Sequence, residues 1–181
     1  MKRKAVFLDR DGVLNRSIIV EGKPKPPKRV SELVILDGVV EAIRLLLSYE
    51  LLPVVISNQP DVARGKILED EVNEINNYLG ETLNLKHFYT CFHDDTDLCV
   101  CRKPLPGLIN RAAIELNIDV HRSYLIGDRW RDIEASHAAG CQPYFIDYSY
   151  SEKAPKTPFI KVSSLMEAAN LIIGEINEIN K

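Results

Sequence analysis

Two aspartates, Asp9 and Asp11, follow the apolar residues of the stretch VFLDRDGVLN. A second acidic stretch, GDRWRD, contributes Asp128. Carboxylates gathered in one place need a cation, and an oxygen-rich site suits Mg²⁺. Beside Mg²⁺ one carboxylate can attack phosphorus while another transfers a proton, and the metal offsets the repulsion between phosphate and carboxylate. These residues therefore indicate phosphoryl transfer, provided that the fold brings Asp128 to Asp9 and Asp11.

Side chains that can hold a phosphoryl group occur elsewhere in the chain. They are the hydroxyl of Ser57, the ammonium of Lys103 and the guanidinium of Arg102, which can bind two phosphate oxygens at once. Behind the aspartates, Gly12 allows the close approach of a ligand. An isolated pair of aspartates on a loop is more often solvated or caps a helix. It is the combination with these other groups that favours catalysis.

The stretch CFHDDTDLCVC has the side chains for a second and different metal site. Its spacing, C-x-H-x₅-C-x-C, supplies the Cys₃His set of a closed, structural, tetrahedral zinc site. The candidate ligands are Cys91, His93, Cys99 and Cys101. The alternative is a group of buried thiols beside a surface histidine, because both pairs are tighter than the usual C-x₂-C. Zinc would limit the conformations of loop 91–103, which presents Lys103.

The elements that must position these residues alternate between short apolar strands and helices. The predicted strands span 4–8, 53–57, 88–91, 124–126 and 143–146, with 34–36 a short strand at most. The predicted helices span 68–79, 106–116 and 130–139, and two more begin after Asp37, which can cap its helix, and at Leu165; residues 16–32 form a polar, proline-rich loop. This alternation predicts a parallel sheet covered on both faces. Ligands of such sheets bind beyond the carboxyl ends of the strands, where Asp9, Ser57 and Asp128 fall.

The composition is that of an ordinary globular protein, with 181 residues of which 45% are hydrophobic and 27% charged. The formal net charge of −3 argues against non-specific binding to nucleic acid or acidic membranes. No apolar run approaches the roughly 20 residues of a membrane span, and the N-terminal stretch lacks the about 7–15 apolar residues of a secretory signal. Clustered cysteines suit a metal site in a reducing compartment. We therefore expect one domain of residues 1–181, cytoplasmic and monomeric, with no nucleic-acid or membrane partner.

Four motifs in order, DRDGVLN, SNQ, RKP and GDRWRD, make the chain resemble the haloacid dehalogenase-like phosphatases over about residues 6–146. The resemblance implies a three-layer, Rossmann-like α/β sandwich with a mainly parallel sheet. It also implies that Asp9 is the nucleophile and Asp11 the general acid and base. Ser57 and Lys103 would hold the transferring phosphoryl group.

The same resemblance assigns the Mg²⁺ ligands, which are Asp9, Asp128 and the backbone carbonyl of Asp11. We expect Asp132 to orient this site rather than to bind the metal. Members of the family often insert a cap domain, but the stretches between the motifs are too short for one, so we expect a capless enzyme with a small zinc-binding loop. The loops that would then set substrate specificity are 16–32, 58–66 and 91–103.

The pattern CxH…CxCRKP resembles the subgroup that contains the D-glycero-D-manno-heptose 1,7-bisphosphate 7-phosphatases and the histidinol-phosphate phosphatase domain. The five-residue spacer is closer to the histidinol-phosphate form, whereas NQPDVARGKI, Asn58–Ile67, resembles the heptose enzymes' NQSGIARGKF. The resemblance implies a Mg²⁺-dependent phosphomonoesterase that acts through an aspartyl phosphate and removes the 7-phosphate of the heptose bisphosphate in lipopolysaccharide precursor synthesis. Histidinol-phosphate phosphatase of histidine biosynthesis is the alternative of the same class. A non-catalytic phosphate-binding module is the alternative of another class.

Substrate contacts are carried over from the same resemblance. The residues expected to contact the sugar phosphate are Asp9, Arg10, Asp11, Ser17, Ile18, Ile19, Val20, Ser57, Asn58, Gln59, Pro60, Arg64, Arg102, Lys103 and Arg129. Of these, Arg102 and residues 17–20 would contact the part of the substrate that is distant from the reacting phosphate. Pro60 replaces a serine of the heptose enzymes, Asp61 replaces a glycine, and Arg129 stands where they often have lysine.

Overall fold

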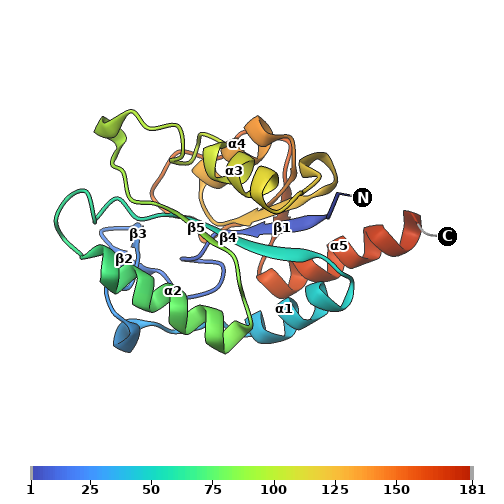
Figure 1. Ribbon diagram of the computed structural model, residues 1–181, viewed down its shortest axis with the longest axis horizontal. Helices are drawn as coiled ribbons and strands as arrows, with labels where there is room; N and C mark the ends of the chain where they lie inside the picture. Colours follow the sequence, from blue (N-terminus) through green and yellow to red (C-terminus); the bar gives the residue numbers. More distant parts are fainter. Residues whose placement is uncertain (1, 180–181) are drawn as a thin grey trace.

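The computed structural model describes residues 2–179, and a six-stranded parallel sheet runs through its middle (Figure 1). In their spatial order the strands are β5 (Phe88–Cys91), β4 (Leu52–Asn58), β1 (Ala5–Leu8), β6 (Tyr124–Gly127), β7 (Gln142–Ile146) and β8 (Ile160–Val162). Each neighbouring pair is parallel. Because a parallel strand can be reached only by a crossover, the connections must lie on the faces of the sheet.

Helices cover both faces, as Figure 1 shows. On one face lie α1 (Val39–Ser48), α2 (Glu69–Leu83) and α5 (Leu165–Ile179), and on the other lie α3 (Gly107–Glu115) and α4 (Trp130–Ala139). Three 3₁₀ turns, η1 (Val30–Glu32), η2 (Asp95–Asp97) and η3 (Val120–Arg122), lie in the connections. This three-layer α/β arrangement confirms the predicted fold class. Within the described part of the chain, no helix is both long enough and apolar enough to cross a membrane.

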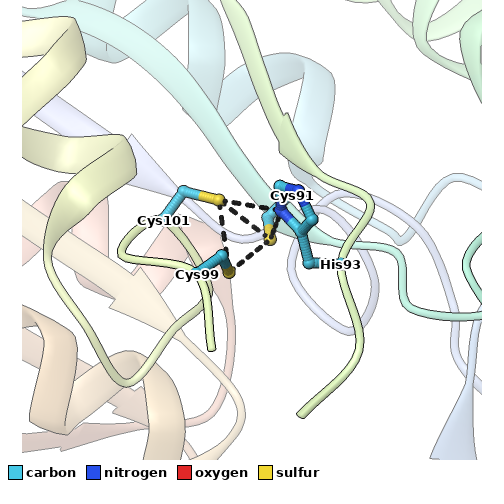
Figure 2. Close-up of side chains that lie close together, drawn as sticks. All are labelled: Cys91, His93, Cys99 and Cys101. Carbon is cyan, nitrogen blue, oxygen red and sulfur yellow. Dashed lines mark hydrogen bonds between the residues drawn. The ribbon is translucent and has the colours of Figure 1, made fainter. Parts of the chain in front are cut away.

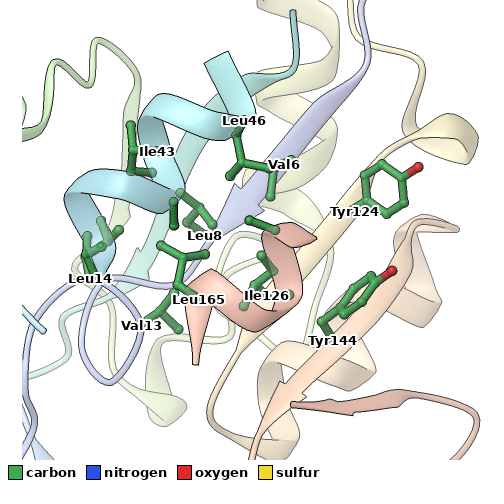
Figure 3. Close-up of a cluster of buried hydrophobic side chains, with 14 of the residues drawn as sticks. Val6, Leu8, Val13, Leu14, Ile43, Leu46, Tyr124, Ile126, Tyr144 and Leu165 are labelled. Atoms are coloured by element: carbon green, nitrogen blue, oxygen red, sulfur yellow. The ribbon is translucent and has the colours of Figure 1, made fainter. Parts of the chain in front are cut away.

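Strand β1 shows how the sequence builds the core. Val6 and Leu8 belong to the cluster beneath α1 and α5, which Figure 3 shows, whereas Ala5 and Phe7 face the cluster beneath α3 and α4. All four are fully buried, and burying a large apolar side chain contributes about 1.5–3 kcal/mol. A strand that is buried on both faces carries apolar residues throughout. The first charge, at Asp9, therefore marks the end of the strand and the start of a site.

The segment 16–32 differs from the predicted loop, because it contains a hairpin of β2 (Ile18–Val20) and β3 (Lys23–Lys25). The two residues between the strands, Glu21 and Gly22, have φ of 50° and 72°, as two-residue hairpin turns require. The sequence IIVEGKPK thus contains a hairpin signal, which the prolines around β3 obscured.

Three smaller expectations were also wrong or incomplete. Asp37 does not cap α1, because Gly38, with φ of 76°, occupies the position before the helix and no side chain accepts a hydrogen bond there. The stretch 34–36 forms only a single bridge, between Ile35 and Asn15. Strand β8 was not predicted, since a three-residue edge strand is too short to show a periodic pattern. None of these differences moves the strand ends that carry the candidate site.

Candidate active site and metal centres

The carboxyl ends of the neighbouring strands β1 and β6 bring together three carboxylates. Asp9 follows β1, Asp128 follows β6, and Asp132 lies in the first turn of α4. One oxygen of each lies within 4.8 Å of the others, and all three residues are buried. The backbone N–H of Asp9 donates to the carbonyl of Ile126 at 3.0 Å, which extends the pairing of the two strands to the site. Topology therefore joins the two acidic motifs as the sequence predicted.

This carboxylate cluster is electrostatically crowded. Burial, together with the charge of Asp132, raises the pKa of Asp9 to about 6 against the attraction of Lys103. Burial, followed by the charges of Asp9 and Asp132, raises the pKa of Asp128 well above its ordinary value. The Oδ1 atom of Asp128 is buried without a hydrogen-bond partner. An all-oxygen donor set with an unpartnered carboxylate oxygen fits Mg²⁺, whose charge would offset this repulsion.

Lys103 supplies a positive charge from the other side of the cluster. Its Nζ atom lies 2.8 Å from Oδ1 of Asp9 and 2.6 Å from Oδ1 of Asp132, and it donates to the carbonyl of Ile56 at 2.8 Å. Burial lowers the pKa of Lys103, but the attraction of Asp132 and Asp9 outweighs burial, so the net shift is upward. The side chain is thus a buried, charged donor beside Asp9, where a transferring phosphoryl group needs one.

Asp11 has a different environment, because its carboxylate is held by three neutral or cationic donors. Asn15 donates from Nδ2 at 2.9 Å and Gln59 from Nε2 at 2.8 Å, while Arg10 binds the carboxylate from Nη2 at 3.1 Å. Gln59 also donates to Oγ of Ser57 at 2.8 Å. These bonds fix the orientation of Asp11. The two aspartates of DRDG therefore have different surroundings. Asp9 lies in the carboxylate cluster, whereas Asp11 accepts hydrogen bonds from neighbouring side chains.

Arg10 lies beneath the site rather than in it. Its side chain is fully buried, and besides Asp11 its guanidinium binds Oδ1 of Asn76 at 3.1 Å. Its backbone N–H donates to Oδ1 of Asp9 at 2.8 Å. The substrate contact predicted for Arg10 can therefore come only from its main chain. Its side chain instead buttresses Asp11.

A pocket opens above these groups between the strand ends and the hairpin. It is lined by Asp9, Asp11, Ser17, Pro24, Lys25, Pro26, Asn58, Lys103, Arg129, Arg131 and Asp132. The fold thus brings together Asp9, Asp11, Ser17, Asn58, Lys103 and Arg129 of the predicted site residues. Ser57 lies deeper, with its residue buried and its hydroxyl bound by Gln59.

Sequence reasoning missed two cations in the wall of this pocket, Lys25 and Arg131. Lys25 lies on β3, in the segment that was predicted to be a polar, proline-rich loop. Arg131 lies in the first turn of α4, where a charge usually faces solvent. The only available signals were the basic run KPKPPKR and the second arginine of GDRWRD. Neither signal shows that these two side chains lie at the pocket, because that depends on how the hairpin and α4 pack beside the strand ends.

The other predicted contact residues do not line this pocket. Ile18, Ile19 and Val20 are exposed on β2, and Ile19 borders a neighbouring groove. Pro60 is half-buried in the loop that follows β4. Arg64 binds Oδ2 of Asp94 at 2.7 Å, and Arg102 binds Oδ1 of Asp95 at 2.9 Å.

Both arginines thus engage acidic residues of the cysteine loop. Arg131, which lines the pocket, also reaches Oδ1 of Asp95, at 3.3 Å. Two guanidinium groups therefore share one carboxylate at the boundary between the loop and the pocket. Substrate contacts by Arg64 and Arg102 stay predictions.

The four predicted zinc ligands converge at the end of β5 (Figure 2). The Sγ atoms of Cys91 and Cys99 are 3.8 Å apart, those of Cys99 and Cys101 3.5 Å, and those of Cys91 and Cys101 3.2 Å. Nδ1 of His93 lies 3.6 Å from Sγ of Cys91 and 3.3 Å from Sγ of Cys101. Sulfur atoms bound tetrahedrally to zinc at about 2.3 Å are about 3.8 Å apart. The donor set and its spacing therefore fit zinc.

The loop that contains this cluster is joined to the end of β4, beside the candidate active site. Oδ1 of Asn58 accepts from the backbone N–H of Lys103 at 3.1 Å, and Nδ2 of Asn58 donates to the carbonyl of Lys103 at 2.9 Å. Lys103 comes two residues after Cys101 in the chain. Loop 91–103 is therefore joined through Asn58 to β4 at the residue whose ammonium lies between Asp9 and Asp132.

Comparison with known proteins places this geometry in a family. The HAD-hydrolase-like family model matches residues 100–158, which include the RKP and GDRWRD motifs. A Yersinia pestis protein named D-glycero-beta-D-manno-heptose-1,7-bisphosphate 7-phosphatase is 33% identical over 147 residues, covering 75% of this chain and 75% of that protein. A protein of the same name from Pasteurella multocida (strain Pm70) is 34% identical over 148 residues, covering 76% and 77%.

A solved structure is similar over nearly the whole chain. It is the crystal structure of D,D-heptose 1,7-bisphosphate phosphatase from B. bronchiseptica complexed with magnesium and phosphate. The TM-score is 0.84 at 27% identity, and the match covers 95% of this chain and 99% of that chain. The chain therefore belongs to the haloacid dehalogenase-like phosphatases, the family of these named relatives, and is a phosphatase.

Proposed function

We propose that the chain is a Mg²⁺-dependent phosphomonoesterase that removes the 7-phosphate of D-glycero-D-manno-heptose 1,7-bisphosphate. The observation that carries the proposal is the similarity, over three-quarters of the chain, to two proteins named for this reaction. The cluster of Asp9, Asp128 and Asp132 beside Lys103 supplies the chemistry that the reaction needs. The product would feed nucleotide-heptose and lipopolysaccharide precursor synthesis in the cytoplasm.

Each residue has a distinct role in the proposed mechanism. A carboxylate oxygen of Asp9 attacks phosphorus and forms an aspartyl phosphate, while Asp11 gives a proton to the departing sugar oxygen. Asp11 then takes a proton from the water that hydrolyses the acyl phosphate. Lys103 holds the phosphoryl oxygens throughout. Mg²⁺, when bound by Asp9, Asp128 and the carbonyl of Asp11, supplies charge neutralisation for the phosphoryl group.

The charges around the pocket favour a bisphosphate over histidinol phosphate. Lys25, Arg129 and Arg131 line the pocket together with the catalytic carboxylates. Arg129 is paired with Glu152 and Arg131 shares Asp95, whereas Lys25 has no ion pair among the residues that the structure describes. A second phosphate would complement this positive wall. The ammonium of histidinol phosphate would face like charges there.

A phosphate-release assay with both compounds tests the proposal. We expect release from the heptose 1,7-bisphosphate with a higher kcat/KM than from histidinol phosphate. Turnover of histidinol phosphate without release from the heptose bisphosphate would contradict the substrate assignment but leave the reaction class intact. A lack of Mg²⁺-dependent hydrolysis with any phosphate monoester would contradict the reaction class.

The remaining parts of the proposal concern architecture. We propose that residues 1–181 form one capless domain, that the protein is a monomer, and that zinc has a structural role in loop 91–103. Elemental analysis is expected to give about one zinc per chain, since one Cys₃His set forms one closed site. Size-exclusion chromatography with light scattering tests the monomeric state.

A further inference from the structure

The segment 147–153, which we call the tyrosine strap, follows β7 and crosses the edge of the active site. Contacts with four different parts of the fold hold it in place. They are Asp147 with Lys161 at 2.7 Å, the N–H of Ser151 with the carbonyl of Gly22 at 3.0 Å, Glu152 with Nε of Arg129 at 3.0 Å, and Lys153 with Glu134 at 2.8 Å. The strap is therefore anchored on both sides of its central residue, Tyr150.

Tyr150 contacts the carboxylate cluster directly. Its hydroxyl donates to Oδ2 of Asp128 at 2.8 Å, and Asp128 is almost completely buried. The other oxygen, Oδ1, has no hydrogen-bond partner. Gly12 packs so closely against Oδ2 that a Cβ atom at this position would lie 1.8 Å from it. The phenol and Gly12 thus confine one oxygen of the carboxylate, and the other oxygen is left free to bind a cation.

We propose that Tyr150 is a positioning residue that orients the Asp128 carboxylate for Mg²⁺. The inference rests on the metal site of the proposed function. A carboxylate can rotate about its terminal bond, and a ligand that is already oriented loses less freedom when the metal binds. Hydrogen bonds from groups behind metal ligands act in this way, and their removal typically weakens metal binding by about 10–100-fold.

The chain offers a matched control in Tyr148. The rings of Tyr148 and Tyr150 lie 5.5 Å apart in the same strap. Within the described residues the hydroxyl of Tyr148 makes no side-chain hydrogen bond, in contrast to that of Tyr150. Replacing either tyrosine by phenylalanine removes one hydroxyl and keeps the ring. Only Tyr150→Phe removes a bond to a proposed metal ligand.

The experiment measures Mn²⁺ binding by electron paramagnetic resonance and Mg²⁺ binding by calorimetry, without substrate. We expect Tyr150→Phe to weaken binding of both ions by about 10-fold, at the lower end of such effects, and Tyr148→Phe to leave it unchanged. In the phosphatase assay the half-saturating Mg²⁺ concentration should rise by the same factor for Tyr150→Phe. The kcat at saturating Mg²⁺ and the zinc content should stay those of the unsubstituted protein.

Thermal unfolding separates positioning from a purely structural role. If Tyr150 orients a metal ligand, Mg²⁺ raises the unfolding midpoint of Tyr150→Phe less than that of the unsubstituted protein. In the absence of Mg²⁺, the two proteins then have the same unfolding midpoint. An equal loss of stability with and without Mg²⁺, or unchanged Mn²⁺ affinity, would overturn the inference. Because ion binding is measured without substrate, a failure of the heptose assignment leaves this result readable.

Discussion

The two candidate metal centres of this protein are built in opposite ways. The four cysteine and histidine ligands all lie within the short stretch from Cys91 to Cys101, on one strand end and its following loop. The carboxylate cluster takes Asp9 from the end of the first strand and Asp128 and Asp132 from the far half of the chain. A local centre can be recognised from spacing alone. A centre assembled across a sheet becomes visible only when the order of the strands is known.

The two centres also differ in charge and exposure, and they meet at one residue. The carboxylates are buried and crowded, whereas His93 lies in the exposed part of the loop. Lys103 belongs to the loop by sequence but to the carboxylate cluster by position, since its ammonium lies between Asp9 and Asp132. We therefore expect the local centre to influence the distributed one through the loop that carries this lysine.

The largest expected effect comes from a change confined to the distributed centre. Asp9→Asn removes the proposed nucleophile, and we expect kcat to fall by about 10³-fold or more, as for other nucleophile substitutions. Zinc content should not change, because Asp9 contacts no ligand of the local centre. Phosphate release and elemental analysis on the same sample measure both. Nearly normal turnover by Asp9→Asn would show that another group attacks phosphorus.

A smaller effect is expected when a ligand of the local centre is removed and the turnover that depends on the distributed centre is measured. Cys99→Ser removes one of the four proposed zinc ligands, and we expect it to loosen loop 91–103, which carries Lys103. We expect loss of zinc and a fall in turnover of about 10–100-fold, as when the supporting groups of a site are removed. Cys141→Ser is the matched control, because Cys141 lies outside the cluster. If Cys99→Ser loses zinc but keeps full activity, the two centres are not coupled through Lys103.

The smallest effect is expected from the exposed ion pairs between loop 58–66 and loop 91–103. Arg64 pairs there with Asp94 and Asp61, and exposed ion pairs contribute little to stability. Arg64→Ala should retain zinc and shift the unfolding midpoint no more than Arg29→Ala, which breaks the exposed pair of Arg29 with Glu32. Thermal unfolding followed by zinc analysis checks this. A clear loss of zinc in Arg64→Ala alone would show that loop 58–66 supports the local centre.

The layers of the fold could be predicted from the sequence because apolar residues recur at regular spacing in most strands and helices. Strand 88–91 and helix 130–139 have the predicted bounds, since an apolar run and a closing glycine at Gly140 mark them clearly. The hairpin of β2 and β3 and the edge strand β8 were missed, because three-residue strands carry almost no period. Errors thus concentrated where local signals are short.

The residues of the candidate site also differ in how far local patterns could identify them. Asp9, Asp128 and the four zinc ligands could be named from motif order and spacing, and they converge in the structure as predicted. For Arg102 the contact with the substrate was carried over from the family resemblance, and it stays a prediction. In the structure its guanidinium is engaged by Asp95.

By itself, the sequence determined the side chains available for chemistry: aspartates at strand ends, a lysine after the cysteine motif and a compact set of candidate zinc ligands. These follow from residue type and spacing, which are local properties that can be taken directly from the sequence. Only the tertiary structure decided which groups share a pocket. Lys25 reaches its wall because the β2–β3 hairpin packs over the strand ends, Arg131 reaches it from the first turn of α4, and Tyr150 reaches Asp128 from the tyrosine strap. Such contacts join residues far apart in the chain, and no local pattern encodes them.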